Sequence, residues 1–256
     1  MAALSEHGDE AKLLAGGQSL IPLMRLRLAR PSVLVDLGRA DELRGISVDG
    51  DSVSIGALTS HSTLEHSADL AEACPLLAHV ASQVGDPAVR HRGTLGGSLA
   101  HADPASDLPA AVLALGGTLV ATGPGGSREI AATDFFTGFL ESALAVDEVL
   151  TEVRVPVSTG GWCYQKFNRR AQDWAIVGAA VVVNGGVCGV GLVNMDSQPV
   201  RAAATEASVD SGGTAAEAAA LAADGLEPSA DLNASVEYRC HLARVLTRRG
   251  LEESGL

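Results

Sequence analysis

Two glycine-containing stretches decide how this chain is interpreted: Leu14 to Pro22, which reads LAGGQSLIP, and Arg92 to Asp107, which reads RGTLGGSLAHADPASD. In each stretch a Gly-Gly pair is followed within two residues by a serine, Ser19 or Ser98. Consecutive glycines allow close backbone approach and leave amide groups that can converge on an anion, and the serine hydroxyl can add a donor. Neither stretch is a Walker loop or has the G-x-G-x-x-G spacing of a Rossmann turn. Together they predict a pyrophosphate group held from two sides.

Glycine pairs alone are weak evidence, because the chain holds 29 glycines and seven Gly-Gly pairs, and the usual role of such a pair is a turn. The first stretch differs because of its surroundings. A predicted strand, Lys12 to Ala15, runs directly into it, and a segment with helical periodicity, Leu20 to Leu28, follows it.

The rest of the first 157 residues mixes short strands and helices without the regular alternation of a doubly wound sheet. Asp49-Gly50 lies within a run of alternating apolar and polar residues and predicts a β-hairpin, because Asp-Gly supplies the positive φ angles of a type I′ turn. Two helices are expected before the second glycine stretch, with Ser60 or Ser62 as N-cap. Strands are predicted at 33–37 (short and buried), 46–55 (the hairpin), 118–122 and 149–155, and helices at 59–72, 75–84 and from 133–136 onward.

Ser158-Thr159-Gly160-Gly161 marks the expected domain boundary, which divides the chain into residues 1–157 and 158–256. Beyond it, strands are predicted at 162–167, 175–183 and 187–193, with a turn at Asn184-Gly185-Gly186, and helices at 215–223 and 236–249. The predicted fold class is therefore α+β: a two-part N-terminal region, followed by a small C-terminal antiparallel sheet with helices.

Composition excludes several functions. The 256 residues include 18 basic and 31 acidic side chains, a formal net charge of −13, which argues against nucleic-acid binding. No apolar run is long enough to span a membrane. The cysteines, Cys74, Cys163, Cys188 and Cys240, include no C-x-x-C pair, so we expect no iron–sulfur, zinc or other metal site in this chain. Scattered thiols also favour a reducing compartment, and we expect a cytoplasmic protein.

The two glycine stretches closely resemble those of the FAD-binding medium subunit of the molybdenum hydroxylases, the xanthine dehydrogenase and aerobic carbon monoxide dehydrogenase group. Tyr164 to Ala175, YQKFNRRAQDWA, is similar to a third motif of that family, and Val236 to Arg249, VEYRCHLARVLTRR, to its C-terminal helix. The resemblance covers nearly the whole chain. It implies FAD as cofactor and a p-cresol methylhydroxylase-like two-part FAD-binding domain over residues 1–157. Because the family usually carries a further strand and part of a helix before this point, a truncated N-terminal edge is expected.

The resemblance also implies which residues contact the cofactor. Residues 14–20 would wrap the FAD pyrophosphate through backbone amides, and residues 94–98 would form a second loop for phosphate and ribityl chain. The implied cofactor-binding residues are Leu14, Ala15, Gly16, Gly17, Gln18, Ser19, Leu20, Ala57, Val84, Thr94, Leu95, Gly96, Gly97, Ser98, Asp107, Leu150 and Lys166.

The remaining single positions have separate implied roles. Asp107 would accept a hydrogen bond from a cofactor hydroxyl, and Val84 would pack near the adenosine. Leu150 and Lys166 resemble family positions beside the isoalloxazine, and Ala57 is a further contact by analogy with the wider fold. A cation such as Lys166 near the flavin pyrimidine favours the anionic reduced state and raises the reduction potential.

The same residues allow other interpretations. Lys166 and Arg170 could pair with Asp173 in a surface network. Asp103 and Asp107 could be a helix N-cap and a first-turn acid, an arrangement that the intervening proline suits.

By resemblance, the chain would be an oxidoreductase subunit for electron transfer, without a catalytic residue that acts on the primary substrate. Substrate would be oxidised at a molybdenum cofactor in a large subunit, and electrons would pass through iron–sulfur clusters of a small subunit. FAD would then pass them to NAD or a quinone-like acceptor. The alternatives are a self-contained FAD-linked oxidase, for which the roughly 100 residues after Val157 leave little room for a substrate pocket, and a flavin-free scaffold subunit. The sequence identifies neither the primary substrate nor the acceptor.

Overall fold

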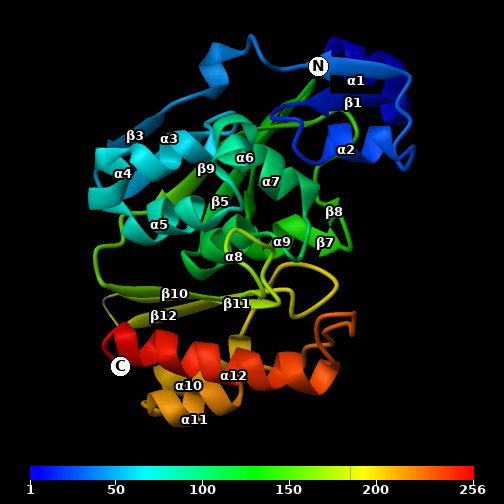
Figure 1. Ribbon diagram of the computed structural model, residues 1–256. Coiled ribbons are helices and arrows are strands. Elements are labelled where there is room, and N and C mark those ends of the chain that lie inside the picture. Colours follow the sequence, from blue (N-terminus) through cyan, green and yellow to red (C-terminus); the bar gives the residue numbers. More distant parts are fainter. Residues whose placement is uncertain (185) are drawn as a thin grey trace.

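A parallel two-stranded sheet near the N-terminus carries the first glycine stretch in the computed structural model, which describes residues 1–184 and 186–256 (Figure 1). Strand β1 (Ala11–Leu14) pairs with β2 (Val33–Asp36), and α2 (Leu20–Arg25) follows the glycines, as predicted. The prediction that β2 is buried is wrong: Leu34 is 42% exposed, because β1 and β2 form a sheet of their own at one end of the molecule. The other elements of this part are α1 (Ala2–His7), η1 (Gly8–Glu10) and η2 (Asp41–Leu43).

An antiparallel five-stranded sheet forms the centre of the following region. In spatial order its strands are β3 (Ile46–Asp49), β4 (Ser52–Gly56), β9 (Val149–Pro156), β5 (Thr118–Gly123) and β6 (Gly126–Ala131). The predicted hairpin is confirmed, since Asp49 pairs with Ser52 and Gly50 has a φ of 56°. Between β6 and β9 lie α9 (Ala132–Phe135), β7 (Phe136–Gly138) and β8 (Glu141–Ser142).

A layer of short helices packs beside this sheet (Figure 1). Ser60 caps the first helix, as predicted, but Ser67 then ends it and caps a second helix by accepting a hydrogen bond from the Leu70 amide. One helix absent from the prediction is capped by Asp86 and has Pro87 in its first turn. Another follows Thr94, where a loop was predicted, and a helix that begins at Asp107 was expected only in the alternative role of the Asp103 and Asp107 pair. The helices of this layer are α3 (His61–His66), α4 (Ala68–Ala73), α5 (Pro75–Gln83), α6 (Pro87–Arg92), α7 (Leu95–His101) and α8 (Asp107–Ala114).

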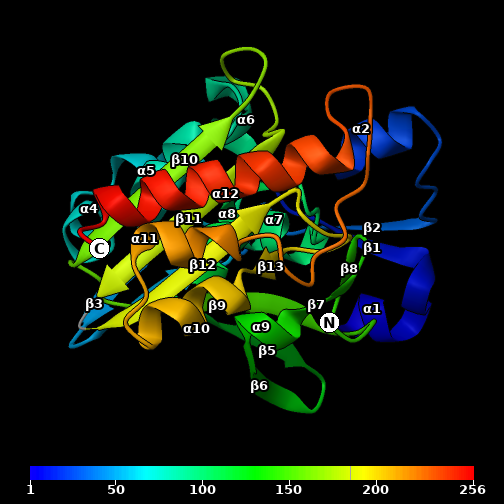
Figure 2. The ribbon, with the colours of Figure 1, turned by 90° about the horizontal axis from the view of Figure 1, so that it is seen from below.

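The C-terminal part is an antiparallel four-stranded sheet with helices on its outer face (Figures 1 and 2). Its strands are β10 (Gly161–Phe167), β11 (Val177–Asn184), β12 (Val187–Val193) and β13 (Val200–Arg201), and its helices are α10 (Ala203–Asp210), α11 (Ala215–Ala220) and α12 (Val236–Glu253). The predicted turn at Asn184-Gly185-Gly186 includes Gly185, which lies outside the described residues. Helix α10 is an addition to the prediction. The α+β fold class is confirmed.

The inner face of this sheet packs directly on α8. A Cβ placed on Gly189 would lie 1.9 Å from the Ala114 carbonyl oxygen, and one on Gly191 would lie 1.9 Å from that of Ala110. Only glycine therefore fits at these two positions of β12. One hydrophobic core contains residues from the five-stranded sheet, the helical layer and β10 to β12, and a second core lies between the C-terminal sheet and α10 to α12. Among the described residues, no helix is both long and apolar enough to cross a bilayer.

Candidate functional site

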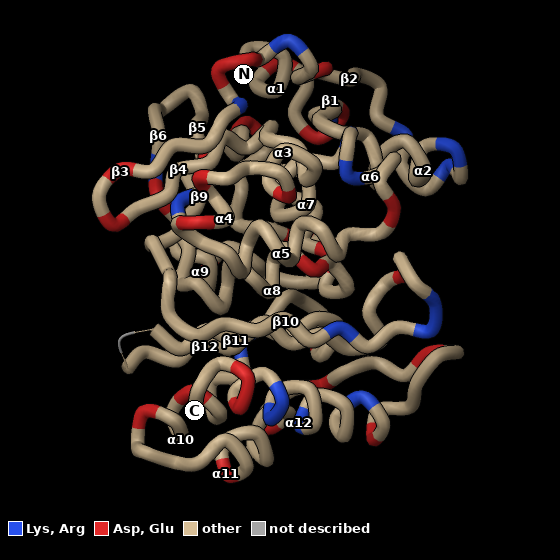
Figure 3. The backbone as a smooth tube through the Cα atoms, turned by 60° about the vertical axis from the view of Figure 1, so that its left-hand side comes forward, with Lys and Arg blue, Asp and Glu red and all other residues tan. Residues whose placement is uncertain are grey.

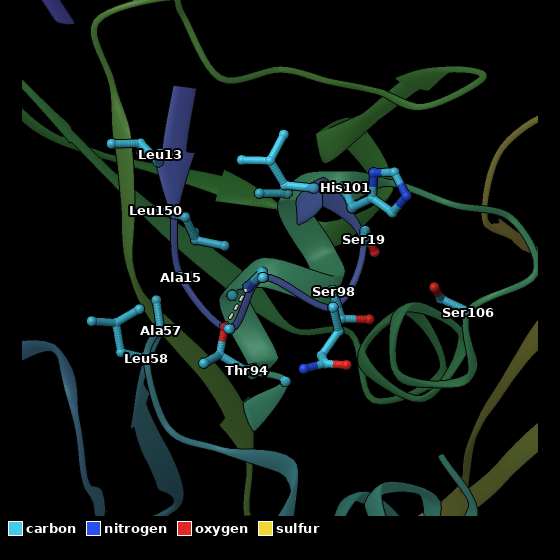
Figure 4. Close-up of a pocket in the computed structure, with 18 of the residues that line it drawn as sticks. Leu13, Ala15, Ser19, Ala57, Leu58, Thr94, Ser98, His101, Ser106 and Leu150 are labelled. Atoms are coloured by element: carbon cyan, nitrogen blue, oxygen red, sulfur yellow. Dashed lines mark hydrogen bonds between the residues drawn. The ribbon is translucent and has the colours of Figure 1, made fainter. Parts of the chain in front are cut away.

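A cavity of about 830 Å³ opens between the loop after β1, helix α7 and strands β9 and β10 (Figure 4). Both glycine stretches face it, and they approach each other, since a Cβ on Gly97 would lie 3.7 Å from the Ala15 Cβ. A cavity of this size accommodates a large organic cofactor. The sequence-predicted residues that line it are Ala15, Gly16, Gly17, Gln18, Ser19, Leu20, Ala57, Val84, Thr94, Gly96, Gly97, Ser98, Asp107, Leu150 and Lys166.

The first glycine stretch is an open loop without space for side chains at its glycines. A Cβ on Gly16 would lie 2.1 Å from the carbonyl oxygen of Arg92, and Gly17 has a φ of 75°, in the left-handed region. Within residues 1–184 and 186–256, no acceptor is found for the backbone amides of residues 16–19. Consecutive free amides beside a cavity form a concave donor surface that suits an anion.

The second glycine stretch differs, because it forms the first turn of α7. The Thr94 hydroxyl accepts a hydrogen bond from the Gly97 amide at 3.1 Å, and the Gly96 amide donates to the Ala57 carbonyl at 2.8 Å. The expectation of free amides therefore holds for the first stretch and is wrong for Gly96 and Gly97. Their lack of side chains still matters: a Cβ on Gly96 would lie 2.5 Å from the Ala57 Cβ.

A buried ion pair lies in the cavity wall where α8 meets β10. Lys166 Nζ is 2.8 Å from Asp107 Oδ2, and the two side chains are 7% and 8% exposed. Lys166 also donates to the Gln83 carbonyl, and the Tyr164 hydroxyl donates to Asp107 Oδ1. Burial raises the pKa of Asp107, while the Lys166 charge and the hydrogen bonds from Lys166 and Tyr164 oppose that rise. The network places a cation and a carboxylate at one position of the cavity.

This ion pair decides between the two interpretations of Lys166. Arg170 does pair with Asp173, at 3.2 Å, but Lys166 pairs with Asp107 instead. The interpretation as a surface network is therefore correct for Arg170 and Asp173 and wrong for Lys166. The physical reason is that the Lys166 side chain lies on the inward face of β10, whereas Arg170 lies in the exposed loop that follows this strand.

The alternative role of the Asp103 and Asp107 pair is half correct. Asp107 is the acidic residue in the first turn of α8, as that alternative predicts. The N-cap, however, is Ser106, and the Asp103 carboxylate accepts a hydrogen bond from the Ala105 amide within the preceding turn.

Two predicted contact residues lie elsewhere. Leu14 lines a second cavity, of about 210 Å³, on the other side of the same loop. Leu95 is fully buried in the core, and its amide donates to the Thr59 carbonyl at 3.0 Å. Both residues support the loops from behind, as neighbours of residues that line the main cavity.

Several cavity residues were missed by sequence reasoning. His61 is the most unusual, because it is 5% exposed and burial lowers its pKa from 6.5 to about 4. The charge of Arg90 adds to this decrease, and neither ring nitrogen has a hydrogen-bond partner among the described residues. The ring packs on Gly93, where a Cβ would lie 2.9 Å from His61 Cε1. A lone histidine in a predicted helix carries no sequence signal for such a position.

Other lining residues that the sequence did not predict come from β1, from the second glycine stretch, from the segment before β9 and from the third motif. Together with His61 they include Lys12, His101, Ser106, Leu144, Val146, Glu148 and Trp174. The cations among the described lining residues are Lys12 and Lys166. Arginines gather instead on α2 and the turn after it, at Arg25, Arg27 and Arg30 (Figure 3). An anionic ligand in the cavity would therefore depend mainly on backbone amides.

No group of His, Cys, Asp and Glu side chains that could hold a metal ion is found among the described residues. The cysteines Cys74, Cys163, Cys188 and Cys240 are free thiols, far from one another in the sequence.

The cavity fits FAD on the evidence of its own atoms. The glycine loop presents unpaired amides that a side chain would obstruct, which suits a pyrophosphate, and the volume suits a dinucleotide. Lys166 and Asp107 supply both a donor and acceptors inside the same cavity.

Comparison with known proteins gives a consistent result. Residues 1–158 match the family model of the FAD binding domain in molybdopterin dehydrogenase, and residues 162–254 match that of the CO dehydrogenase flavoprotein C-terminal domain. The carbon monoxide dehydrogenase medium chain of Hydrogenophaga pseudoflava is 38% identical, over 98% of this chain and 91% of the relative. The nicotine 6-hydroxylase medium subunit of Paenarthrobacter nicotinovorans is 36% identical, over 96% and 90%.

Solved structures agree with these relatives. A carbon monoxide dehydrogenase from Hydrogenophaga pseudoflava, lacking the Mo-pyranopterin moiety of its cofactor, superimposes with a TM-score of 0.94 at 40% identity, over 99% of this chain and 92% of that chain. Quinoline 2-oxidoreductase from Pseudomonas putida 86 gives 0.90 at 36% identity, with the same coverage. With the family model covering more than half of the chain, the resemblance stated from the sequence is confirmed. The chain belongs to the FAD-binding medium subunits of the molybdenum hydroxylases, and is thus a subunit of an oxidoreductase.

Proposed function

We propose that this subunit passes electrons, which it receives from the iron–sulfur clusters of a small partner subunit, through FAD to NAD or a quinone-like acceptor. The primary substrate would be oxidised at the molybdenum cofactor of a large partner subunit. The observation that carries the proposal is the glycine loop with its unpaired amides, which lies in the wall of a cavity large enough for FAD. FAD, when bound, supplies the chemistry of accepting and releasing electrons.

The loop is proposed to hold the pyrophosphate of FAD. The amides of residues 16–19 can donate hydrogen bonds to phosphate oxygens, and no side chain at Gly16 or Gly17 obstructs them. Thr94, Gly97 and Ser98 form the facing wall. The absence of a side chain at Gly97 allows the cofactor to approach α7 closely. This arrangement agrees with the scarcity of cations in the cavity.

The remaining predicted residues are proposed to contact other parts of the cofactor. Val84 lies in the same wall as Gly85 and Asp86, which suits packing against the adenosine. Leu150 and Lys166 are proposed to flank the isoalloxazine, where the Lys166 ammonium would stabilise negative charge on the reduced ring. Asp107 holds that ammonium in place, and Ala57 completes the floor beneath α7.

Residues 1–157 are proposed to be the FAD-binding domain, and residues 158–256 the C-terminal medium-subunit domain. The two family models, which meet between residues 158 and 162, support this division. A reducing, cytoplasmic location is proposed on the basis of the four free thiols.

The test is a visible absorbance spectrum and an activity assay of the full chain, purified alone and together with its partner subunits. We expect bound flavin in the complex, and reduction of that flavin by the primary substrate only when the partner subunits are present. A colourless protein that FAD cannot reconstitute in either form would contradict the proposal. Turnover of a small substrate by the isolated chain would instead support a self-contained oxidase.

A further inference from the structure

Tyr164 lies behind the cavity, in contact with the ion pair that lines it. It precedes Lys166 by two residues on β10, so both side chains project from the same face of the strand. The Tyr164 side chain is 8% exposed and is not part of the cavity wall, whereas Asp107 and Lys166 are. Its hydroxyl donates to Asp107 Oδ1, while Lys166 donates to Oδ2 at 2.8 Å. Each carboxylate oxygen thus has one donor.

The neighbouring strand leaves room for the phenol. Gly178 of β11 pairs with Lys166 of β10, and a Cβ on Gly178 would lie 3.1 Å from the Tyr164 hydroxyl oxygen. The same Cβ would lie 3.0 Å from Val193 Cγ2, so the neighbour on its other side allows little adjustment. A larger residue at this position would push the hydroxyl away from Asp107.

The phenol is a constant donor, because burial and the charge of Asp107 raise its pKa well above the ordinary value. Asp107, by contrast, is held between opposing effects. Burial raises its pKa, and the contacts with Lys166 and Tyr164 oppose that rise. A hydrogen bond to a buried carboxylate is worth more than one between neutral groups, so its loss favours protonation of Asp107.

We propose that Tyr164 is a positioning residue of the flavin site: its hydroxyl keeps Asp107 ionised, and so sets how much of the Lys166 charge acts on the bound flavin. The inference rests on the proposed function, since it requires FAD beside Lys166. With Asp107 ionised, the carboxylate offsets most of the ammonium charge. With Asp107 protonated, that charge is unopposed, which favours the anionic reduced flavin and raises its midpoint potential.

Other titratable groups lie on the elements around α8, and each is unchanged by a substitution at Tyr164. They are His79 on α5, His101 on α7, Asp134 on α9, Cys188 on β12 and Arg201 on β13, together with Asp9, Lys12, His61, Asp86, Glu148 and Asp173 in the cavity wall. Lys166 and Tyr164 are the groups that contact the Asp107 carboxylate among the described residues. A difference between two pH profiles therefore isolates this network.

The test is the midpoint potential of bound FAD, measured as a function of pH in the FAD-loaded full chain or complex. We expect the midpoint potential of Tyr164→Phe to equal that of the unsubstituted protein at alkaline pH. As the pH falls, the potential of the variant should rise above that of the unsubstituted protein, because Asp107 protonates at a higher pH in the variant. Gly178→Ala should act in the same direction, and Asp107→Asn should raise the potential at every pH at which Asp107 of the unsubstituted protein is ionised. Tyr238→Phe is the matched control, because Tyr238 is the only other tyrosine and is 42% exposed.

Superimposable profiles for Tyr164→Phe, Gly178→Ala and the unsubstituted protein would overturn the inference while leaving the proposed function intact. Should Tyr164→Phe fail to fold, the Gly178→Ala profile decides in the same way. Failure of the unsubstituted protein to bind FAD would overturn the proposed function itself, so the two failures are distinguishable.

Discussion

Replacing Gly16 by alanine should disable the FAD loop while leaving the rest of the fold in place. The added Cβ would lie 2.1 Å from the Arg92 carbonyl oxygen and 2.8 Å from both the Arg92 carbonyl carbon and the Gly93 Cα. All three are backbone atoms, and Cβ contacts under 3.0 Å essentially do not occur in proteins. No rotation of a side chain can relieve this overlap, so the loop itself must move away from α6 and α7.

The size of the effect follows from this displacement. Relieving the contact needs a shift of at least about 0.9 Å at Gly16, and crowding of this kind costs about 1–3 kcal/mol of stability. The shift carries the neighbouring amides away from the pyrophosphate. A hydrogen bond to a charged group contributes about 1.5–3 kcal/mol, so loss of one or two weakens FAD binding by roughly tenfold to twenty-thousandfold.

The assay is FAD binding, followed by quenching of flavin fluorescence, combined with thermal unfolding of the same samples. Gly125→Ala is the matched control, because a Cβ on Gly125 meets nothing within 4 Å and that glycine lies in the turn between β5 and β6. We expect the control to bind FAD normally. If Gly16→Ala bound FAD within about threefold of the unsubstituted protein, the assignment of the pyrophosphate to this loop would be refuted.

Two further predictions concern the facing wall. Thr94→Val removes the hydroxyl that accepts a hydrogen bond from the Gly97 amide, and should lower the free energy of unfolding by about 1 kcal/mol. Thr94→Ser should restore this stability, measured by urea denaturation. If Thr94→Val were as stable as the unsubstituted protein, the capping role would be contradicted. His61, whose pKa burial lowers from 6.5 to about 4, contributes stability that is fully present above pH 6.5 and is lost as the pH falls from 6.5 to about 4, by at most about 3 kcal/mol. His61→Phe should flatten this part of the stability profile measured by urea denaturation, and an unchanged slope would show that His61 does not titrate as inferred.

The sequence predicted the elements whose signals are local. The Asp49-Gly50 hairpin, strand β1 leading into the glycines, and the final helix were all predicted from patterns within a few residues. Ser67 was missed because it both ends one helix and begins the next, so the apolar periodicity continues across the break. Residue order alone could not detect that.

The site shows the same division between local and long-range information. The motif residues that line the cavity were accessible from resemblance. The pairing of Asp107 with Lys166 and Tyr164 joins residues almost sixty positions apart, and no local sequence pattern predicts such a contact. The second glycine stretch was assigned free amides, although Thr94 is itself a helix-capping residue type. Its hydroxyl, not a ligand, satisfies the Gly97 amide.

The contact between β12 and α8 has a consequence for how such subunits diverge. Gly189 and Gly191 let the strand rest on helix carbonyls that belong to the other half of the chain. Each half therefore supplies the complementary surface that the other needs for its interior. Exchange of the C-terminal half between two relatives should yield a folded hybrid only where both glycines face a helix of matching position. Because both positions require glycine, recombination between the two halves is restricted, and we expect the two halves to be inherited together.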